Sequence, residues 1–403
     1  MMSESNKRHS DAETVTGSNG RTHFDKVSHG YSKAAKIIFI SMAALFLVTL
    51  FFNSKLITYN NFSYLMRDIS SAADIASENY SSISYKNDEM RVTKGFRGGI
   101  ITVSSTDLTI YNATGRRTLS INENLVSPNI AVSKKYAVVY ELGGNKYRVY
   151  NSFARISAGS YDYPISGAAV SDSGWFALVT KDNEHNSVVH LYDDDCHLRN
   201  TYSFASKYVF SVAINEKGSR IAIVLTEPDG DKFSTSVMIC DPGKNEKRSE
   251  VKVSSGLSYG CAFTESNNIQ LVCSDGVFIV NGNDGAIINS CEFFDRKINR
   301  VSLTSRGVAV SFSGHQEKNG NEILVFDKNG NQVYNNIVSG GIIDMEYSDG
   351  YLFINQSTSI ERINIKKDER KSYKITEDGT DIIIYDSSNI LVCCPTKAMY
   401  VRM

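Results

Sequence analysis

Apolar and polar positions alternate in short runs from residue 82 to the end of the chain. Each apolar run is followed by Gly, Asn or Asp and then by polar residues, which is the pattern of strands joined by tight turns. The 22 Tyr, 19 Phe and 28 Gly residues suit this arrangement, because aromatic residues favour strands and glycine favours turns. The C-terminal part of the chain is therefore predicted to be all-β.

One local pattern recurs through this region: an apolar strand, an Asp or Asn, a polar turn and a polar strand. It is seen in LTIYNATG (108–115), VHLYDDDC (189–196) and ILVFDKNG (323–330). The Asp or Asn of each repeat is Asn112, Asn151, Asp193, Asp241, Asn281, Asp327 and Asn364. The repeats follow one another at about 40–50 residues, a period typical of β-propeller blades.

The two ends of the repeat region complement each other. The last segment, 380–403, holds three strands of a further unit and stops where its outer strand is due. The segment SISYK (82–86) precedes the first repeat and can supply that strand, which would leave fewer open sheet edges. We therefore predict an eight-bladed β-propeller, with seven blades as the alternative if one partial unit is not a true blade.

A long apolar run lies before the repeats. Ile37 to Ser54 carries no charged residue, and Lys36 and Lys55 bracket it, so its length suits a membrane-spanning helix. The run begins late in the chain and ends without a small-x-small motif, which favours an uncleaved signal anchor over a cleaved signal peptide. Lys and Arg are more frequent before the run than after it, which favours an N-terminus inside and a C-terminus outside.

These patterns divide the chain into four parts. The expected parts are a disordered cytoplasmic tail (1–34), a transmembrane signal anchor (35–56), a juxtamembrane helix or linker (57–80) and an extracytoplasmic β-propeller (81–403). Within the third part, apolar residues recur at helical spacing, which predicts a short amphipathic helix. Its apolar stripe either packs on the propeller, continues the membrane helix as a stalk or forms a partner-binding face.

Charge and cysteine content exclude some classes of function. The chain has 43 Lys and Arg against 44 Asp and Glu, so nothing in its charge favours a nucleic-acid partner. Its 7 Cys residues form no CxxC motif, and small buried hydrophobic residues explain them better than a disulfide framework. Because neighbouring residues of a strand point in opposite directions, at most one of Cys393 and Cys394 is expected to face the core.

Motifs for catalysis, phosphate binding and structural metals are not found. The sequence contains no HExxH or Walker motif, and no catalytic or cofactor-binding residue is predicted. Asp193, Asp194 and Asp195, followed by Cys196 and His197, are weak metal-ligand candidates. They occupy the turn that every repeat has, where an Asp or Asn side chain bonds backbone amides. The repeated Asp and Asn residues are therefore predicted to be structural turn formers.

Two sequence segments carry a resemblance. FSYLMRDISSAADIAS after the anchor and GGIITVSSTDLTIYNATGRR in the first repeat resemble an uncharacterised family of membrane-anchored propeller proteins of Gram-positive, largely anaerobic bacteria. The resemblance covers roughly residues 35–403 and implies an architecture and a location, with no active site. More distantly, the repeats resemble WD40-like and quinoprotein-like propellers, although quinoprotein blades are usually rich in Trp and Trp175 is the only one here.

The expected function follows from this architecture. The first hypothesis is a non-enzymatic binding or scaffold module, held at the outer face of the cell membrane, for a protein or cell-envelope ligand. The alternative is a propeller enzyme, an oxidoreductase or lyase, with its site in the central channel. A third reading is a receptor that signals through the helix to its tail. Clustered acids, bases or cations around the channel would favour the enzyme, and the sequence specifies neither the ligand nor the oligomeric state.

Overall fold

The computed structural model describes residues 18–52, 81–85, 91–152, 154–244, 246–315 and 320–403. The chain separates into two compact units, Met1–Phe62 and Ser63–Met403, which are described separately. The predicted amphipathic helix within 57–80 lies outside the described residues.

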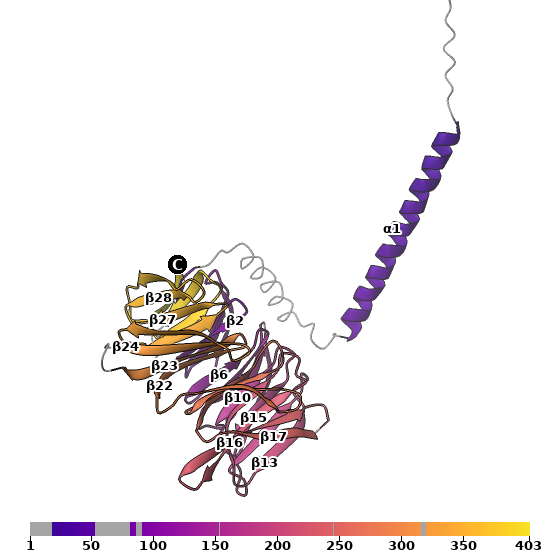
Figure 1. The fold of residues 1–403 in the computed structure, drawn as a ribbon. Helices are drawn as coiled ribbons and strands as arrows, with labels where there is room; N and C mark the ends of the chain where they lie inside the picture. Colours follow the sequence, from indigo (N-terminus) through magenta and orange to yellow (C-terminus); the bar gives the residue numbers. More distant parts are fainter. Residues whose placement is uncertain (1–17, 53–80, 86–90, 153, 245, 316–319) are drawn as a thin grey trace, which may run out of the picture. The chain divides into compact units, whose positions relative to one another are not determined.

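The first unit contains one helix, α1 (Ser18–Phe52), in its described part (Figure 1). Its segment Tyr31–Val48 has a mean hydropathy of 1.6 and is long and apolar enough to cross a membrane. The helix begins at Ser18 and so includes polar residues that precede the apolar run. Adding residues to an existing helix costs far less than starting one, so the apolar run can propagate a helix into the polar residues before it.

The second unit is built from four-stranded antiparallel sheets, which we number as blades in chain order (Figure 1). Blade 1 consists of β2 (Val92–Phe96), β3 (Gly99–Val103), β4 (Asp107–Tyr111) and β5 (Arg117–Asn122), and blade 2 of β6 (Pro128–Val132), β7 (Tyr136–Glu141), β8 (Lys146–Asn151) and β9 (Arg155–Ser160). Blade 3 consists of β10 (Gly167–Val170), β11 (Phe176–Thr180), β12 (Ser187–Tyr192) and β13 (Leu198–Phe204), and blade 4 of β14 (Tyr208–Ile214), β15 (Ile221–Asp229), β16 (Lys232–Asp241) and β17 (Glu246–Ser254). Blade 5 consists of β18 (Ser258–Phe263), β19 (Ile269–Cys273), β20 (Gly276–Val280) and β21 (Ile287–Glu292), and blade 6 of β22 (Lys297–Thr304), β23 (Gly307–His315), β24 (Gly320–Asp327) and β25 (Gln332–Ser339). Blade 7 consists of β26 (Asp344–Ser348), β27 (Tyr351–Asn355), β28 (Ser359–Asn364) and β29 (Glu369–Lys374), and blade 8 of β30 (Asp381–Ile384), β31 (Asn389–Cys393), β32 (Lys397–Arg402) and β1 (Ile83–Ser84).

The first strand of each blade lines a common axis. These inner strands contact one another in a closed circle, from β2 through β6, β10, β14, β18, β22, β26 and β30 back to β2. The predicted eight-bladed propeller is therefore confirmed, and the seven-bladed alternative is wrong.

The hydrophobic core lies between the blades. Second strands such as β11, β19 and β31 are buried along their whole length, whereas β29 is exposed throughout. One representative cluster joins Val179 of blade 3 to Ile223 and Leu225 of blade 4. Burying each such side chain contributes about 1.5–3 kcal/mol, so the packing between neighbouring blades holds the ring together.

Packing on both faces of a blade explains one expectation that was wrong. Cys393 and Cys394 are both buried, with 2% and 3% of their surface exposed. Cys393 packs with Ile83 and Ile100 on one face of blade 8, and Cys394 packs with Phe353 on the other. Adjacent strand residues do point in opposite directions, but a propeller blade is covered by a neighbour on each side.

The two ends of the propeller region meet in blade 8, as the sequence predicts. Strand β1 pairs antiparallel with β32, with Ile83 opposite Ala398 and Ser84 opposite Lys397. The backbone N–H of Tyr85 donates to the Thr396 carbonyl at 3.0 Å. Ile83 is 1% exposed, so the closing strand contributes a core side chain as well as hydrogen bonds.

Candidate functional site

The repeated Asp and Asn residues all lie where the third strand of a blade turns into the fourth. The Asn112 Oδ1 atom accepts the Arg116 N–H at 2.7 Å, and Asp327 Oδ1 accepts the N–H groups of Asn329 and Asn331 at 2.8 and 2.9 Å. Side-chain oxygens of Asn151, Asp193, Asn281 and Asn364 accept backbone N–H groups in the same way. Their contribution to folding stays a prediction.

Asp241 occupies the corresponding position of blade 4. Its backbone carbonyl accepts the Lys244 N–H at 3.1 Å, and its Oδ2 atom lies 3.7 Å from the Arg220 guanidinium. The first residue of this turn is therefore tied back to the start of the second strand of the same blade.

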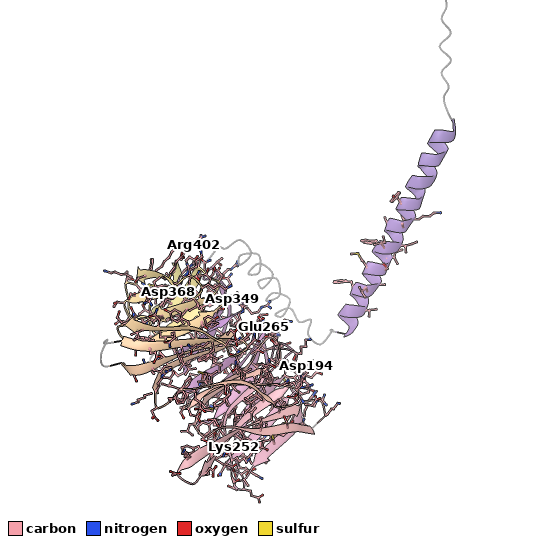
Figure 2. The ribbon with its side chains drawn as sticks, in the orientation of Figure 1. Asp194, Lys252, Glu265, Asp349, Asp368 and Arg402 are labelled. Carbon is pink, nitrogen blue, oxygen red and sulfur yellow. The ribbon has the colours of Figure 1, made fainter. Side chains whose placement is uncertain are left out.

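The three aspartates at 193–195 are not brought together by this turn. Asp193 is 2% exposed, and its carboxylate accepts the His197 N–H at 2.7 Å and the Arg199 Nε–H at 2.5 Å. Asp194 and Asp195 are exposed, and Figure 2 shows where Asp194 lies. Within the described residues, no three His, Cys, Asp or Glu side chains are placed to hold a metal ion.

The main candidate site is a cavity in the central channel that charged side chains line. A cavity of about 530 Å³ is lined by the inner strands of blades 1, 2, 6, 7 and 8 and by adjoining turns. The charged side chains that the inner strands contribute to its lining are Lys94, Asp344, Glu346 and Asp381. Its volume falls in the range of small-ligand sites.

Two carboxyl groups in this cavity, those of Asp344 and Glu346, have raised pKa values. Asp344 Oδ2 accepts the Ile382 N–H at 2.8 Å, which links the starts of β26 and β30, yet burial raises the pKa of Asp344. Burial, followed by the nearby Asp344 carboxylate, raises the pKa of Glu346 to about 8, although Lys94 acts in the opposite direction. The removal of a carboxyl group from water disfavours its charged form, and a neighbouring carboxylate adds to that effect.

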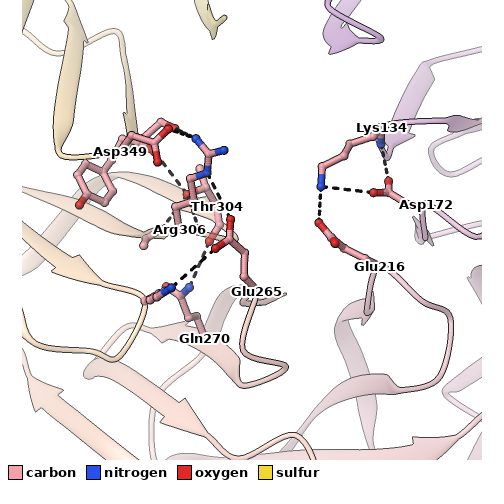
Figure 3. Close-up of polar contacts among 12 residues, drawn as sticks. Lys134, Asp172, Glu216, Glu265, Gln270, Thr304, Arg306 and Asp349 are labelled. Atoms are coloured by element: carbon pink, nitrogen blue, oxygen red, sulfur yellow. Dashed lines mark hydrogen bonds and ion pairs between the residues drawn. The ribbon is translucent and has the colours of Figure 1, made fainter. Parts of the chain in front are cut away.

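Ion pairs connect the turns that follow the inner strands (Figure 3). Lys134 of blade 2 lies 3.6 Å from the Asp172 carboxylate of blade 3 and 2.5 Å from the Glu216 carboxylate of blade 4. Arg306 of blade 6 likewise pairs with Glu265 of blade 5, at 3.6 Å, and with Asp349 of blade 7. Apart from the half-buried Asp172 these groups are well exposed, so each pair contributes about 0–1 kcal/mol and mainly orients the turns.

Blades 4, 5 and 6 share an irregularity in their inner strands. Each has a register shift against the second strand, and the extra residues are Phe210, Tyr259 and Asn299. A β-bulge of this kind re-aims a side chain and is common beside functional sites. Phe210 and Tyr259 are 48% and 55% exposed, and Tyr208 beside them is 48% exposed. We call Tyr208, Phe210 and Tyr259 the aromatic bulge cluster.

The aromatic bulge cluster and the cavity carboxylates lie over different blades. Strands β14 and β18 contact each other, so the three aromatic side chains lie on neighbouring blades. Every blade starts with its inner strand, so Tyr208 and Asp381, which begin β14 and β30, belong to the same end of the channel. This end therefore has an aromatic side on blades 4 and 5 and an acidic side on blades 7 and 8.

The sequence analysis did not predict the aromatic bulge cluster or the carboxyl groups of the cavity. The segments DMEYS (344–348) and YVFSVAI (208–214) read as ordinary strands, and neither contains a recognised motif. A usable signal was present, because first strands of other repeats, such as GAAV (167–170), carry small apolar residues where these carry acids or aromatics.

Solved structures share the fold at low sequence identity. BamB from Moraxella catarrhalis matches with a TM-score of 0.55 and 10% identity, covering 81% of this chain and 99% of that one. Sqt1 of Saccharomyces cerevisiae matches with a TM-score of 0.59 and 10% identity over the same shares of the two chains. No curated protein matches the sequence. The model of a family of unknown function, DUF5711, matches residues 74–403, so this chain belongs to that family.

Proposed function

We propose that this protein is a membrane-anchored, extracytoplasmic and non-enzymatic binding module, which holds a protein ligand at the channel end where the inner strands begin. The observation that carries the proposal is the pair of β-bulges on consecutive blades at Phe210 and Tyr259, whose side chains are about half exposed. A cell-envelope polymer is the second ligand class that the sequence allows, and the test below separates the two.

Energetic reasoning supports an aromatic contact at this place. The side chains of the aromatic bulge cluster are about half exposed on their inner strands, whereas the inner strand β10 of blade 3 carries only Gly, Ala and Val. Aromatic residues dominate the binding energy of protein interfaces, since they bury a large area at a small cost in conformational entropy. A cluster on rigid strands is also preorganised, which reduces the entropy lost when a ligand binds.

The apolar helix supports the location. Tyr31–Val48 has the length and composition of a membrane span, and Lys33 and Lys36 lie on its N-terminal side. Positive residues tend to stay on the cytoplasmic side, which would leave the propeller outside the cytoplasm.

A cross-linking experiment tests the proposed ligand site. In native membranes, a photoreactive phenylalanine analogue at position 210 or 259 should form protein adducts, because both side chains face solvent on the proposed surface. The same analogue at Tyr373, 45% exposed on the outer strand of blade 7, is the matched control and should form none. Once the adduct is identified, Phe210→Ala with Tyr259→Ala should weaken its binding at least about tenfold.

Two outcomes would contradict this proposal. One is equal cross-linking from positions 210, 259 and 373. The other is an identified adduct whose affinity does not change in the double variant. Adducts with polysaccharide in place of protein would transfer the same surface to a cell-envelope ligand.

The proposed orientation has its own test. An epitope placed after Met403 should be reached by antibody on intact cells, whereas one placed before Met1 should be reached after permeabilisation alone. The reverse result would place the propeller in the cytoplasm and would refute an extracytoplasmic module.

One observation favours a second function. The Glu346 pKa of about 8 lies where a general acid or base works best at neutral pH. An enzyme with its site in the channel, an oxidoreductase or lyase, is therefore the alternative. Turnover of a small molecule that is lost in Glu346→Gln, without protein adducts at positions 210 and 259, would favour it.

A further inference from the structure

Along the inner strands, three carboxyl groups and one ammonium group line the cavity in the channel. From the inner strands, Asp344, Glu346 and Asp381 line it together with Lys94. The strand β22 contributes Val301, Ser302, Leu303 and Thr304 to the lining, so no charged group of that strand lines the cavity. Arg97 and Lys134 belong to turns beyond the far ends of their inner strands.

Of the carboxyl groups in this cavity, that of Glu346 is the most enclosed by protein. Protein atoms surround its carboxyl group almost completely, yet part of the residue stays accessible because it lines the cavity. Asp344 receives the Ile382 N–H, whereas within the described residues no donor is bonded to the Glu346 carboxyl group. A carboxyl group enclosed by protein without a hydrogen-bond donor is unfavourable, so a ligand that supplies donors would be stabilised there.

The arrangement of the carboxyl groups selects the kind of ligand. Within the described part of the channel, no three acidic groups converge on one point as a metal ion requires. They are instead distributed along β26 and the start of β30, which neighbour each other. A planar guanidinium or an ammonium group carries several N–H donors and can bond separated carboxylates.

We propose that this cavity binds an organic cation, a guanidinium or ammonium group, between Glu346, Asp344 and Asp381, and that Glu346 releases its proton to solvent as the cation enters. The O–H bond of the Glu346 carboxyl breaks, its proton goes to the buffer, and the carboxylate that remains pairs with the incoming cation. The inference does not depend on the proposed protein ligand, because it concerns other blades.

The release of the Glu346 proton on cation binding follows from the charges that face Glu346. These are Asp344 on its own strand, Asp381 on β30 and Lys94 on β2. Without ligand, two acidic neighbours against one ammonium favour the protonated form. An added cation reverses that balance, since it offsets one carboxylate and donates hydrogen bonds to Glu346.

Calorimetry on the full-length protein in a non-ionic detergent tests this inference, with methylguanidinium chloride as the probe. A guanidinium stays charged at all pH values used here. With a pKa of about 8, Glu346 is about nine-tenths protonated at pH 7. We therefore expect release of about one proton per bound cation at pH 7, measured by comparing buffers of different ionisation enthalpy. The association constant should rise about tenfold per pH unit up to pH 8 and then level off.

Variants make the result specific. Glu346→Gln should abolish proton release and flatten the pH dependence, whereas Lys94→Met should tighten binding about fivefold because it removes a competing cation. Asp349→Asn changes an exposed carboxylate of the same blade outside the cavity lining and is the matched control, expected to bind like the parent protein. Phe210→Ala should also leave cation binding unchanged, so failure here and failure of the protein-ligand proposal are distinguishable.

Two sources can supply the cation, a free small molecule or an arginine side chain of a protein. A short glycine peptide with one central arginine, titrated beside methylguanidinium, separates them. Tighter binding of the peptide identifies a side chain as the ligand, and tighter binding of the free cation identifies a small molecule. Absence of saturable binding by both probes between pH 6 and 9, or proton release that persists in Glu346→Gln, would overturn the inference.

Discussion

Replacing Ile83 with aspartate is expected to destabilise the propeller by more than about 4 kcal/mol, the largest effect predicted for a single substitution in this chain. Ile83 is 1% exposed and packs with Ile100 of blade 1 and Leu391 of blade 8. A carboxylate at this position would be buried without a partner, and the apolar contacts of isoleucine would be lost as well. The milder Ile83→Ala leaves a cavity and should cost about 3 kcal/mol.

The effect extends beyond one side chain because β1 closes the ring. Strand β1 belongs to the start of the propeller region and pairs with β32, which belongs to the end of that region. When β1 detaches, β32 becomes an open edge with unpaired backbone groups, which favours pairing with other chains. We therefore expect Ile83→Asp protein to aggregate on mild heating as well as to unfold earlier.

A matched control exists on blade 5. Ile288 also stands on an outermost strand, β21, but is 50% exposed, so Ile288→Ala and Ile288→Asp should change the unfolding free energy by less than about 0.5 kcal/mol. Denaturant titration of the full-length proteins, followed by tyrosine fluorescence, measures all four variants. Similar midpoints for the Ile83 and Ile288 substitutions would show that blade 8 does not need β1.

The closing strand also shows what sequence reasoning can reach. Turns between strands are set by local chemistry, so the repeated Asp and Asn residues revealed the period of the blades and the shared eighth blade. Burial of both Cys393 and Cys394 could not be predicted in this way. It depends on two neighbouring blades covering both faces of one strand, and no property of the segment itself signals this.

The functional residues of the channel could not be predicted from the sequence for a similar reason. Glu346 stands in a strand that looks half-polar, and its pKa is raised by burial and by the Asp344 and Asp381 carboxylates, of which Asp381 belongs to another blade. The bulges at Phe210 and Tyr259 are differences in register between strands, which an alternating pattern does not record. Long-range placement, and not local preference, determines the candidate site.

The turn at Asp193 separates a structural role from a metal-binding one. Burial raises the pKa of Asp193, but the His197 N–H and the Arg199 guanidinium outweigh it and hold that pKa below its usual value. Asp193→Ala removes these hydrogen bonds and should cost about 2 kcal/mol. Asp194 is exposed and has no such partners among the described residues, so Asp194→Ala should cost less than about 0.5 kcal/mol.

Asparagine at this position provides the decisive comparison. Four other repeats carry Asn at the same point of the turn, at positions 112, 151, 281 and 364, so Asp193→Asn should keep the backbone hydrogen bonds and lose the pairing with Arg199. Its expected cost is about 1 kcal/mol. A metal site would behave differently, because Asp194→Ala would then be harmful and added Ca²⁺ would raise the melting temperature of the parent protein.

Acid titration completes the test, since the sign of the effect follows from the lowered pKa. A carboxyl group whose pKa is lower in the folded state stabilises the protein above its unfolded pKa, about 3.9 for Asp, and this stabilisation is lost as the pH falls through the folded pKa. The parent protein should therefore lose stability relative to Asp193→Asn when the pH is lowered from 5 towards 3. Parallel curves for the two proteins, measured by thermal unfolding, would show that the Asp193 charge contributes nothing to the fold.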